Sequence, residues 1–228
     1  MVAPCPDSSA IEILPYKASY ELMREGKKAG HTTRELKQID RNNWQLSMNS
    51  KASLFFVNFS YQQQSNFSWV NNKPRPDSFL QTDKNSFKAA VIQQQSFDWL
   101  TMLEDGSYKK QKWQLKVTPD IQDRQLSLLS LRIDLLQQDY TKGQQKTFQY
   151  PVSYKGEVSD ESYQFVAEES ITTPAGIFET HKYQKTHDNK SRVSYFWLAK
   201  KLNYLPIRIQ QLKDGEEQAN MLLTAINP

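Results

Sequence analysis

The sequence predicts a mainly β protein, built as a strongly curved antiparallel sheet or open barrel with one central α-helix. Stretches in which apolar and polar residues alternate, a pattern typical of half-buried strands, recur along most of the chain. The hydrophobic fraction is low at 38 %, whereas the aromatic fraction is high at 12 %, and aromatic side chains favour strands. One internal segment breaks the alternation and carries leucines at helical spacing.

The N-terminal half predicts an antiparallel meander. Residues from Tyr16 to Leu22 alternate strictly between apolar and polar, and Glu25 to Lys27 supply a turn into the next strand. The run from Leu54 to Tyr61 is apolar on both faces, which predicts a strand covered on both sides. Asn71 to Pro76 predicts a loop because of its two prolines, and Glu104 to Gly106 predicts a hairpin corner.

The helix is expected at residues 120–138. Asp120 follows Pro119 and is the expected N-cap. The apolar residues that recur at helical spacing are Leu128, Leu131 and Leu135, with Leu129, Ile133 and Leu136 beside them. This broad apolar stripe predicts about four helical turns packed on the sheet. The polar face lacks the cluster of Lys and Arg that a helix lying on a membrane would carry.

The C-terminal half returns to the strand pattern and completes one domain. Apolar and polar residues alternate from Phe148 to Ile226. Turns are expected at Asp160–Glu161, Pro174–Gly176, Asp188–Asn189 and Asp214–Gly215. No repeat or low-complexity linker interrupts the chain. We therefore expect a flexible N-terminal segment at 1–14 and a single β-rich domain at 15–228.

Charge and cysteine content exclude several classes of protein. The net charge of +4 is spread along the chain without a basic block, so no nucleic-acid partner is expected. No apolar run reaches the roughly 18 residues needed to cross a bilayer, so no transmembrane segment is expected. Cys5 stands alone, which excludes an intramolecular disulfide and a cysteine-based zinc site. The first ten residues, MVAPCPDSSA, resemble the segment that follows a cleaved signal peptide.

A series of short motifs in the C-terminal half resembles a known family. Thr172 to Gly176 predicts a tight turn, because proline presets one dihedral angle and glycine accepts a positive one. This turn lies in EESITTPAGIF at 168–178, which is followed by YFWLA at 195–199 and LPIRI at 205–209. In order and spacing, these motifs resemble the bacterial domain-of-unknown-function family 3108.

The resemblance extends over about residues 15–226. The strand that carries Tyr16 and Tyr20, with Gly26 and Gly30 after it, and the helix entered through residues 123–127 also fit the family. Members look like exported proteins of Gram-negative bacteria. The resemblance therefore implies a β-rich fold and export to the periplasm after removal of a signal peptide, and it implies no activity, because none is assigned to the family.

No catalytic residue, metal site or cofactor is expected. His181 and His187 would stand roughly 20 Å apart on an extended strand, too far to share a metal ion. Glu168 and Glu169 are adjacent, so they point to opposite faces of a strand and cannot form the carboxylate pair of a glycosidase. The sequence contains no phosphate-binding loop, dinucleotide fingerprint or nucleophile elbow.

Aromatic residues supply the candidate binding site. The candidate cavity-lining residues are Phe55, Phe59, Tyr61, Phe67, Trp69, Phe97 and Trp99. Rings on a curved sheet can line an apolar cavity beneath the predicted helix, although they can equally form a packed core.

Three function classes remain open, and the sequence sets no oligomeric state. The first is a non-enzymatic periplasmic protein that binds a lipid or another apolar small molecule of the envelope. An enzyme acting on an envelope polymer would require a pair of carboxylates, or a histidine and a carboxylate, in a cleft. An assembly module would pair a free sheet edge with a partner strand.

Overall fold

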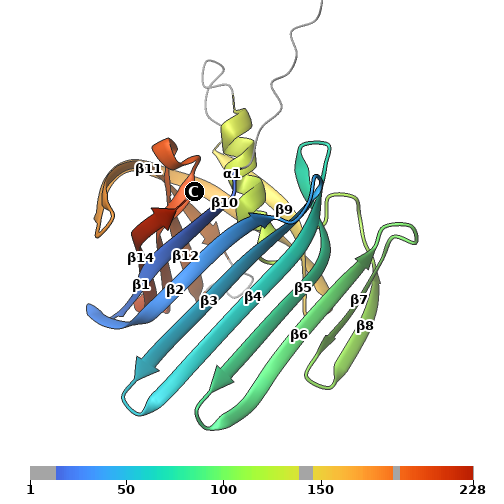
Figure 1. Cartoon of the computed structure of the whole chain (residues 1–228), viewed down its shortest axis with the longest axis horizontal. Coiled ribbons are helices and arrows are strands. Elements are labelled where there is room, and N and C mark those ends of the chain that lie inside the picture. Colours follow the sequence, from blue (N-terminus) through green and yellow to red (C-terminus); the bar gives the residue numbers. More distant parts are fainter. Residues whose placement is uncertain (1–13, 139–145, 187–190, 228) are drawn as a thin grey trace, which may run out of the picture.

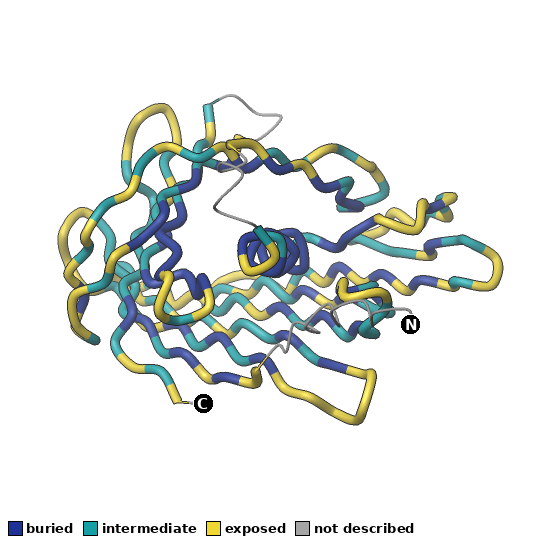
Figure 2. Tube along the Cα trace, turned by 90° about the horizontal axis from the view of Figure 1, so that it is seen from above, coloured by how far each residue is buried: buried dark blue, intermediate teal, exposed yellow. Residues whose placement is uncertain are grey.

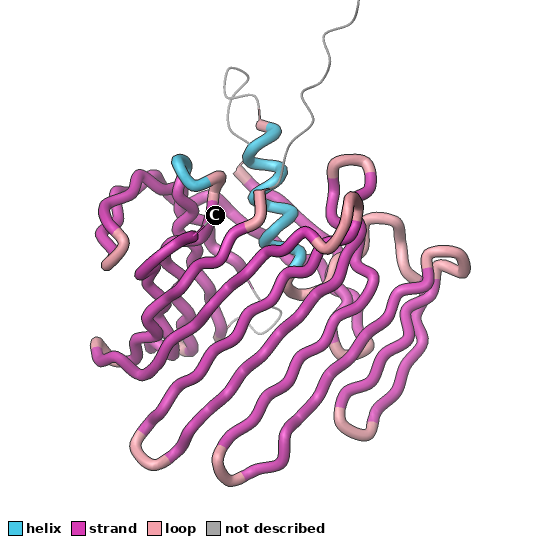
Figure 3. Tube along the Cα trace, in the orientation of Figure 1, coloured by secondary structure: helices cyan, strands magenta, loops and turns pink. Residues whose placement is uncertain are grey.

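The computed structural model describes residues 14–138, 146–186 and 191–227, and antiparallel strands dominate it (Figures 1 and 3). The strands are β1 (Tyr16–Arg24), β2 (Lys27–Gln38), β3 (Asn43–Leu54), β4 (Val57–Val70), β5 (Lys73–Asn85), β6 (Lys88–Asp98), β7 (Leu103–Tyr108), β8 (Gln111–Lys116), β9 (Thr147–Tyr154), β10 (Glu157–Thr173), β11 (Gly176–Thr186), β12 (Arg192–Ala199), β13 (Leu205–Lys213) and β14 (Glu216–Asn227). The helix α1 (Leu126–Gln137) lies between β8 and β9, and a 3₁₀ turn, η2 (Lys200–Leu202), follows β12.

All 14 strands belong to one sheet, whose order is β8-β7-β6-β5-β4-β3-β2-β1-β14-β13-β12-β11-β10-β9. Every strand pairs with its neighbour in sequence, except that β1 pairs with β14 and β8 does not pair with β9. The first and last strands therefore meet in the middle of the sheet. The two edges, β8 and β9, are joined through α1, and the sheet curves around this helix (Figure 2). The predicted fold class, an open curved sheet around a central helix, is confirmed.

Helix α1 is buried on nearly all sides rather than along a single stripe. Its buried residues include Ser127, Ser130 and Arg132 as well as the leucines. Such a helix belongs to the interior of a protein. It begins at Leu126, later than predicted, and Asp120 is exposed outside it. Asp123 acts as the cap instead, because its Oδ1 accepts hydrogen bonds from the amides of Gln125 and Leu126 at 2.8 and 3.1 Å.

Polar contacts hold α1 to both halves of the sheet. On the C-terminal half, the Ser127 hydroxyl donates to Glu161 Oε2 at 2.5 Å, and the Tyr150 hydroxyl donates to Asp134 Oδ2 at 2.6 Å. On the N-terminal half, the Gln125 amide donates to the Leu46 carbonyl at 3.2 Å. The helix thus connects β3 with the β9–β10 pair, and these strands are not neighbours in the sheet.

Two predictions for the N-terminal half, one strand and one loop, are wrong. Leu54 to Tyr61 is not one strand, because β3 and β4 meet there in a tight turn at Phe55–Phe56. The run is apolar on both faces because it is a hairpin tip, not because it is covered twice. Asn71 to Pro76 is not a loop: Asn71 and Asn72 form the turn, and β5 starts at Lys73. Its prolines are tolerated because β5 pairs with β6 only from Ser78 onward.

Two further predicted turns lie inside strands. Glu104 to Gly106 belongs to β7, where the ring of Trp113 on β8 lies across Gly106. A Cβ atom at residue 106 would stand 2.2 Å from that ring, so glycine is required by the close approach rather than by a turn. Asp160–Glu161 lies within β10. The turns at Pro174–Gly176 and Asp214–Gly215 are as predicted, and Asp188–Asn189 lies outside the described residues.

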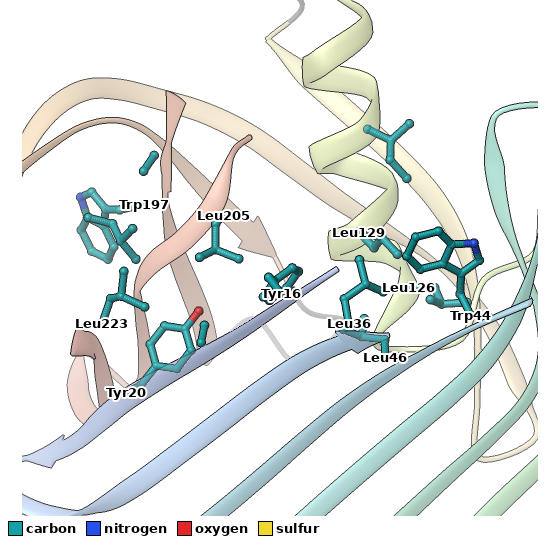
Figure 4. Close-up of a cluster of buried hydrophobic side chains, with 14 of the residues drawn as sticks. Tyr16, Tyr20, Leu36, Trp44, Leu46, Leu126, Leu129, Trp197, Leu205 and Leu223 are labelled. Atoms are coloured by element: carbon teal, nitrogen blue, oxygen red, sulfur yellow. The ribbon is translucent and has the colours of Figure 1, made fainter. Parts of the chain in front are cut away.

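The core lies between α1 and the concave face of the sheet. Its main cluster joins the central strands to the helix through Tyr16, Leu36, Leu46, Leu126 and Leu129, all buried (Figure 4). A second cluster packs the other side of the helix against β9 to β13. Burial at the helix is therefore shared by both halves of the sheet.

Candidate functional site

A cavity of about 420 Å³ lies inside the sheet, and residues at the N-terminal end of α1 help to line it. Side chains from both halves of the sheet and from the start of the helix line it. The lining residues are Leu22, Arg34, Met48, Ser50, Tyr61, Gln63, Gln81, Arg124, Gln125, Leu128, Tyr163, Lys185, Arg192, Ser194, Phe196, Ile209, Gln211, Ala219 and Met221. The volume falls within the range typical of small-molecule sites, roughly 300 to 1,000 Å³.

Glutamines build one wall of the cavity. Gln63 and Gln81 face inward from β4 and β5 and are buried. The Gln63 amide and the Tyr61 hydroxyl both donate to Gln81 Oε1, at 3.1 and 3.2 Å, and the Gln81 amide donates to Asp83 Oδ2 at 2.8 Å. These bonds satisfy the buried amides and hold them in fixed orientations.

Four cationic side chains line the same cavity: Arg34, Arg124, Lys185 and Arg192. Lys185 is paired, because its Nζ lies 2.5 Å from Glu161 Oε1. Burial nevertheless holds the pKa of Lys185 below its usual range, against the opposing effect of Glu161. The Arg124 guanidinium lies over the ring of Tyr154, 4.4 Å from its centroid.

Arg34 is the most unusual of the four. It is 5 % exposed, and its Nε donates to the Tyr16 hydroxyl at 3.2 Å. Its Nη2 is buried and has no hydrogen-bond partner in the part of the chain that the structure describes. A buried charged donor without a partner is costly, so such a group commonly marks a site that a ligand completes.

A second buried arginine meets Arg34 at Tyr16. Arg132 of α1 donates from Nη1 to the same hydroxyl at 3.2 Å and contacts the Asn203 carbonyl at 3.3 Å. Burial acts to raise the pKa of Tyr16, but the charges of Arg132 and Arg34 outweigh it and leave that pKa below its usual value. No carboxylate pairs with either arginine among the described residues. The region is therefore electropositive.

The acidic groups near the cavity are already engaged. Glu161 forms an ion pair with Lys185 and accepts a hydrogen bond from the Ser127 hydroxyl. Asp123 accepts hydrogen bonds from Ser65 and from the first amides of α1, and burial raises its pKa to about 7. Glu161 therefore pairs with Lys185, whereas Arg34, Arg124 and Arg192 form no ion pair among the described residues.

Of the predicted lining residues, only Tyr61 lines this cavity. Phe67 is buried in the main core, and Trp69 packs against that core. Phe97 and Trp99 stack on each other, with centroids 6.1 Å apart, in a small separate cluster. Trp99 also borders a second groove, of about 480 Å³, on another side of α1.

Two predicted residues lie at the ends of the hairpins instead. Phe59 is 40 % exposed, and Phe55 is fully exposed in the β3–β4 turn. Phe55 lies in the turn itself, and Phe59 shares the face of β4 that carries Tyr61 but lies nearer the hairpin tip, outside the lining of the cavity. The sequence analysis missed Arg34 and the inward glutamines, although Arg34 lies two residues from buried Leu36 and so shares its face.

The fold and this cavity together define a class: an open, β-barrel-like sheet that encloses a helix and a polar, electropositive cavity. The chain matches the family described as "Protein of unknown function (DUF3108)" over residues 15–224, and it belongs to that family. No curated protein matches the sequence.

A solved structure shares the architecture. The β-barrel-like protein of domain of unknown function DUF1849 from Brucella abortus is 11 % identical, with a TM-score of 0.59 over 95 % of this chain and 98 % of that chain. At this identity, the likeness concerns the fold alone. A candidate exported protein with a YmcC-like fold from Bacteroides fragilis NCTC 9343 is 12 % identical, with a TM-score of 0.31 over 94 % of each chain. Within the described residues, no helix has the length and hydrophobicity needed to cross a membrane.

Proposed function

We propose that this protein is a non-enzymatic binding protein of the periplasm, which holds a lipid-like amphiphile with an acidic head group inside its curved sheet. The observation that carries the proposal is Arg34, which lines the cavity and whose buried Nη2 has no hydrogen-bond partner in the described chain. A carboxylate or phosphate oxygen there would satisfy this donor with a charge-assisted hydrogen bond.

Charge supports an acidic rather than a neutral head group. Arg34, Arg124, Lys185 and Arg192 line the cavity, and Glu161 pairs with only one of them. In an interior of low effective dielectric, such an excess of positive charge is stabilised by an anion. Arginine suits this role because its planar fork matches carboxylate and phosphate oxygens.

The rest of the lining supports an apolar tail. Leu128 of α1 and Phe196, Ile209 and Met221 of the C-terminal half border the cavity together with Met48. Methionine side chains adapt to ligands of irregular shape. Because the volume of about 420 Å³ lies at the low end for ligand sites, it suits a single acyl chain better than a phospholipid with two chains.

The edges of the sheet give little support to an assembly module. Lys112 and Lys116 lie on edge strand β8, and lysines discourage pairing with another strand. Edge strand β9 contains Pro151. It is also partly covered by the backbone of Gln122, whose N–H donates to the Pro151 carbonyl at 2.8 Å and whose carbonyl accepts from the Ser153 backbone N–H at 2.9 Å.

The described residues give little support to an enzymatic function either. His181 does have a carboxylate neighbour, with its Nε2 3.1 Å from Glu168 Oε1, and Lys200 lies 3.1 Å from the other oxygen of Glu168. The His181 ring is buried between Phe165 and Tyr204 and does not line the cavity. Burial lowers the pKa of His181, which favours the neutral ring.

Displacement of a fluorescent fatty acid, cis-parinaric acid, tests the proposal. We expect saturable binding by the wild-type protein, displaced by oleate much more effectively than by oleyl alcohol. The variant R34Q should bind at least about tenfold more weakly, because it loses a charge-assisted hydrogen bond. R34K keeps the charge and should fall in between, whereas R41Q, in the exposed β2–β3 turn, should match the wild type.

Equal displacement by oleate and oleyl alcohol would contradict the acidic head group. If R34Q, with its fold verified by circular dichroism, bound with wild-type affinity, Arg34 would not contact the ligand. If R34Q fails to fold, R192Q supplies the same comparison from the exposed end of the lining.

A further inference from the structure

Two hairpin turns present aromatic side chains to solvent. Phe55 and Phe56 form the β3–β4 turn and are 100 % and 92 % exposed, and Phe87 in the β5–β6 turn is 73 % exposed. The two turns belong to adjacent hairpins and project together from one end of the sheet (Figure 1). Exposed apolar groups gathered in this way commonly mark a contact surface.

Phe55 adopts an unfavourable backbone conformation without packing against the core. Its φ of 54° lies in the left-handed region, which favours Gly, Asn or Asp over a bulky residue. Some hairpin turns of this sheet use such residues at positive φ, as at Asn71–Asn72 and Asp214–Gly215, whereas others hold Met102, Lys109 or Lys155 there. At the β3–β4 tip the chain instead holds a ring in a strained position and buries none of it, so the ring contributes nothing to the core.

Lysines surround these rings. Lys51 on β3, Lys84 on β5 and Lys88 on β6 are all exposed, and none forms an ion pair with the described residues. Asp83 is the acidic residue nearest to these two tips in sequence, and it accepts a hydrogen bond from the inward Gln81 amide. The tips therefore carry unpaired positive charge next to exposed aromatic rings.

The neighbouring turns at this end extend the positive surface. Lys109 and Lys110 form the β7–β8 turn and are exposed. Lys27 and Lys28 begin β2, where Lys28 pairs with Glu21 and Glu25 adds one negative charge. Cations therefore outnumber acids at the tips of the β3–β4, β5–β6 and β7–β8 hairpins, whereas the β13–β14 turn at the same end carries Asp214, Glu216 and Glu217.

We infer that the β3–β4 and β5–β6 turns dock the protein on the surface of an anionic phospholipid bilayer. The rings of Phe55, Phe56 and Phe87 enter the interface between head groups and acyl chains, and the lysines contact the acidic head groups. A bilayer suits this geometry better than a protein partner does, because the three rings stand on separate tips and none of them lines the groove of about 560 Å³ that runs beside these hairpins.

This docking goes beyond the proposed binding function and stands on different residues. It has a bearing on the cavity nevertheless. Arg192 and Gln211, which line the cavity, lie on the segments of β12 and β13 next to the β13–β14 turn, at the same end of the sheet as the phenylalanine tips. A protein docked by these tips has that end of the cavity turned toward the bilayer.

Co-sedimentation with vesicles tests the inference. The vesicles contain phosphatidylglycerol and phosphatidylethanolamine in equal parts, with phosphatidylcholine vesicles as the neutral comparison. We expect the wild type to bind the anionic vesicles, and F55N/F56S to bind them at least about tenfold more weakly. The matched control is L100S, because Leu100 is 98 % exposed in the β6–β7 turn at the opposite end of the sheet, and it should bind as the wild type does.

Two further measurements separate docking from its alternatives. F55N/F56S should melt no lower than the wild type, because Asn tolerates a positive φ better than Phe, and it should keep wild-type binding of cis-parinaric acid. Failure of docking is thus distinct from failure of the cavity proposal. Equal vesicle binding by wild type and F55N/F56S, or an equal loss in L100S, would overturn the inference. So would a wild-type dimer that F55N/F56S converts to a monomer without any vesicle binding, because the tips would then contact a second copy.

Discussion

The Ser65 hydroxyl of β4 donates a hydrogen bond of 2.9 Å to Asp123 Oδ1, and so joins the sheet to the residue that caps α1. Asp123 is fully buried, and its Oδ2 has no hydrogen-bond partner within the described ranges. The start of the helix therefore rests on one interior carboxyl group. Burial raises the pKa of this group to about 7, despite the hydrogen bonds from Ser65, Gln125 and Leu126 that oppose the shift.

This shift predicts how stability depends on pH. The folded state holds the Asp123 proton up to about pH 7, whereas the unfolded chain loses it near pH 4. Between these values the folded state binds more protons, so the contribution of Asp123 to the free energy of unfolding decreases as pH rises, by on the order of 4 kcal/mol. Urea unfolding of D123N should lack this decrease. A difference between wild type and D123N that is the same at pH 4 and pH 8 would contradict the assignment.

Helix α1 should behave as core rather than as a removable lid. Leu131 is fully buried, so L131A should lower the free energy of unfolding by roughly 2 to 5 kcal/mol. Leu136, on the same helix, is 36 % exposed, and L136A should cost less than about 1.5 kcal/mol. Urea denaturation of the two variants checks this contrast. Similar small losses in both would indicate a helix that the sheet does not need.

The Glu161–Lys185 pair should oppose ligand binding while it supports the fold. E161Q removes the carboxylate that lies 2.5 Å from Lys185, which leaves a buried cation without a charged partner. We expect a loss of roughly 3 kcal/mol in the free energy of unfolding and, because the cavity becomes more positive, tighter binding of oleate by E161Q. Urea denaturation and displacement of cis-parinaric acid measure the two effects. Weaker oleate binding by a folded E161Q would contradict an anionic ligand.

The sequence was sufficient for much of the fold because strand periodicity is local. Strict alternation from Tyr16 to Leu22 predicts β1, and the leucines of 126–137 predict α1. Turns were harder to place, since Phe55–Phe56 resembles the inside of a strand and Glu104 to Gly106 resembles a corner. Phe55 and Phe56 turn out to be exposed to solvent in a hairpin turn. Gly106 lies inside a strand because the ring of Trp113, on the neighbouring strand, packs across it.

The candidate site was largely out of reach of the sequence. Aromatic residues suggested an apolar cavity, yet the rings of Phe67 and Phe97 fill core clusters and that of Phe55 lies in solvent. The cavity is lined instead by polar residues such as Gln63 and Arg34, which in a strand pattern look like an outward face. Only the curvature of the sheet around α1 turns that face inward, and the two halves of this curved sheet are joined by pairing between β1 and β14, the first and last strands.

Native mass spectrometry of protein purified from a bacterial envelope tests the central claim most directly. The account predicts a stoichiometric added mass in the wild type, which organic extraction identifies as an acidic amphiphile with a single acyl chain and which is absent from R34Q. A clean mass of the bare chain across repeated wild-type preparations, or a bound neutral lipid that R34Q retains, would contradict it.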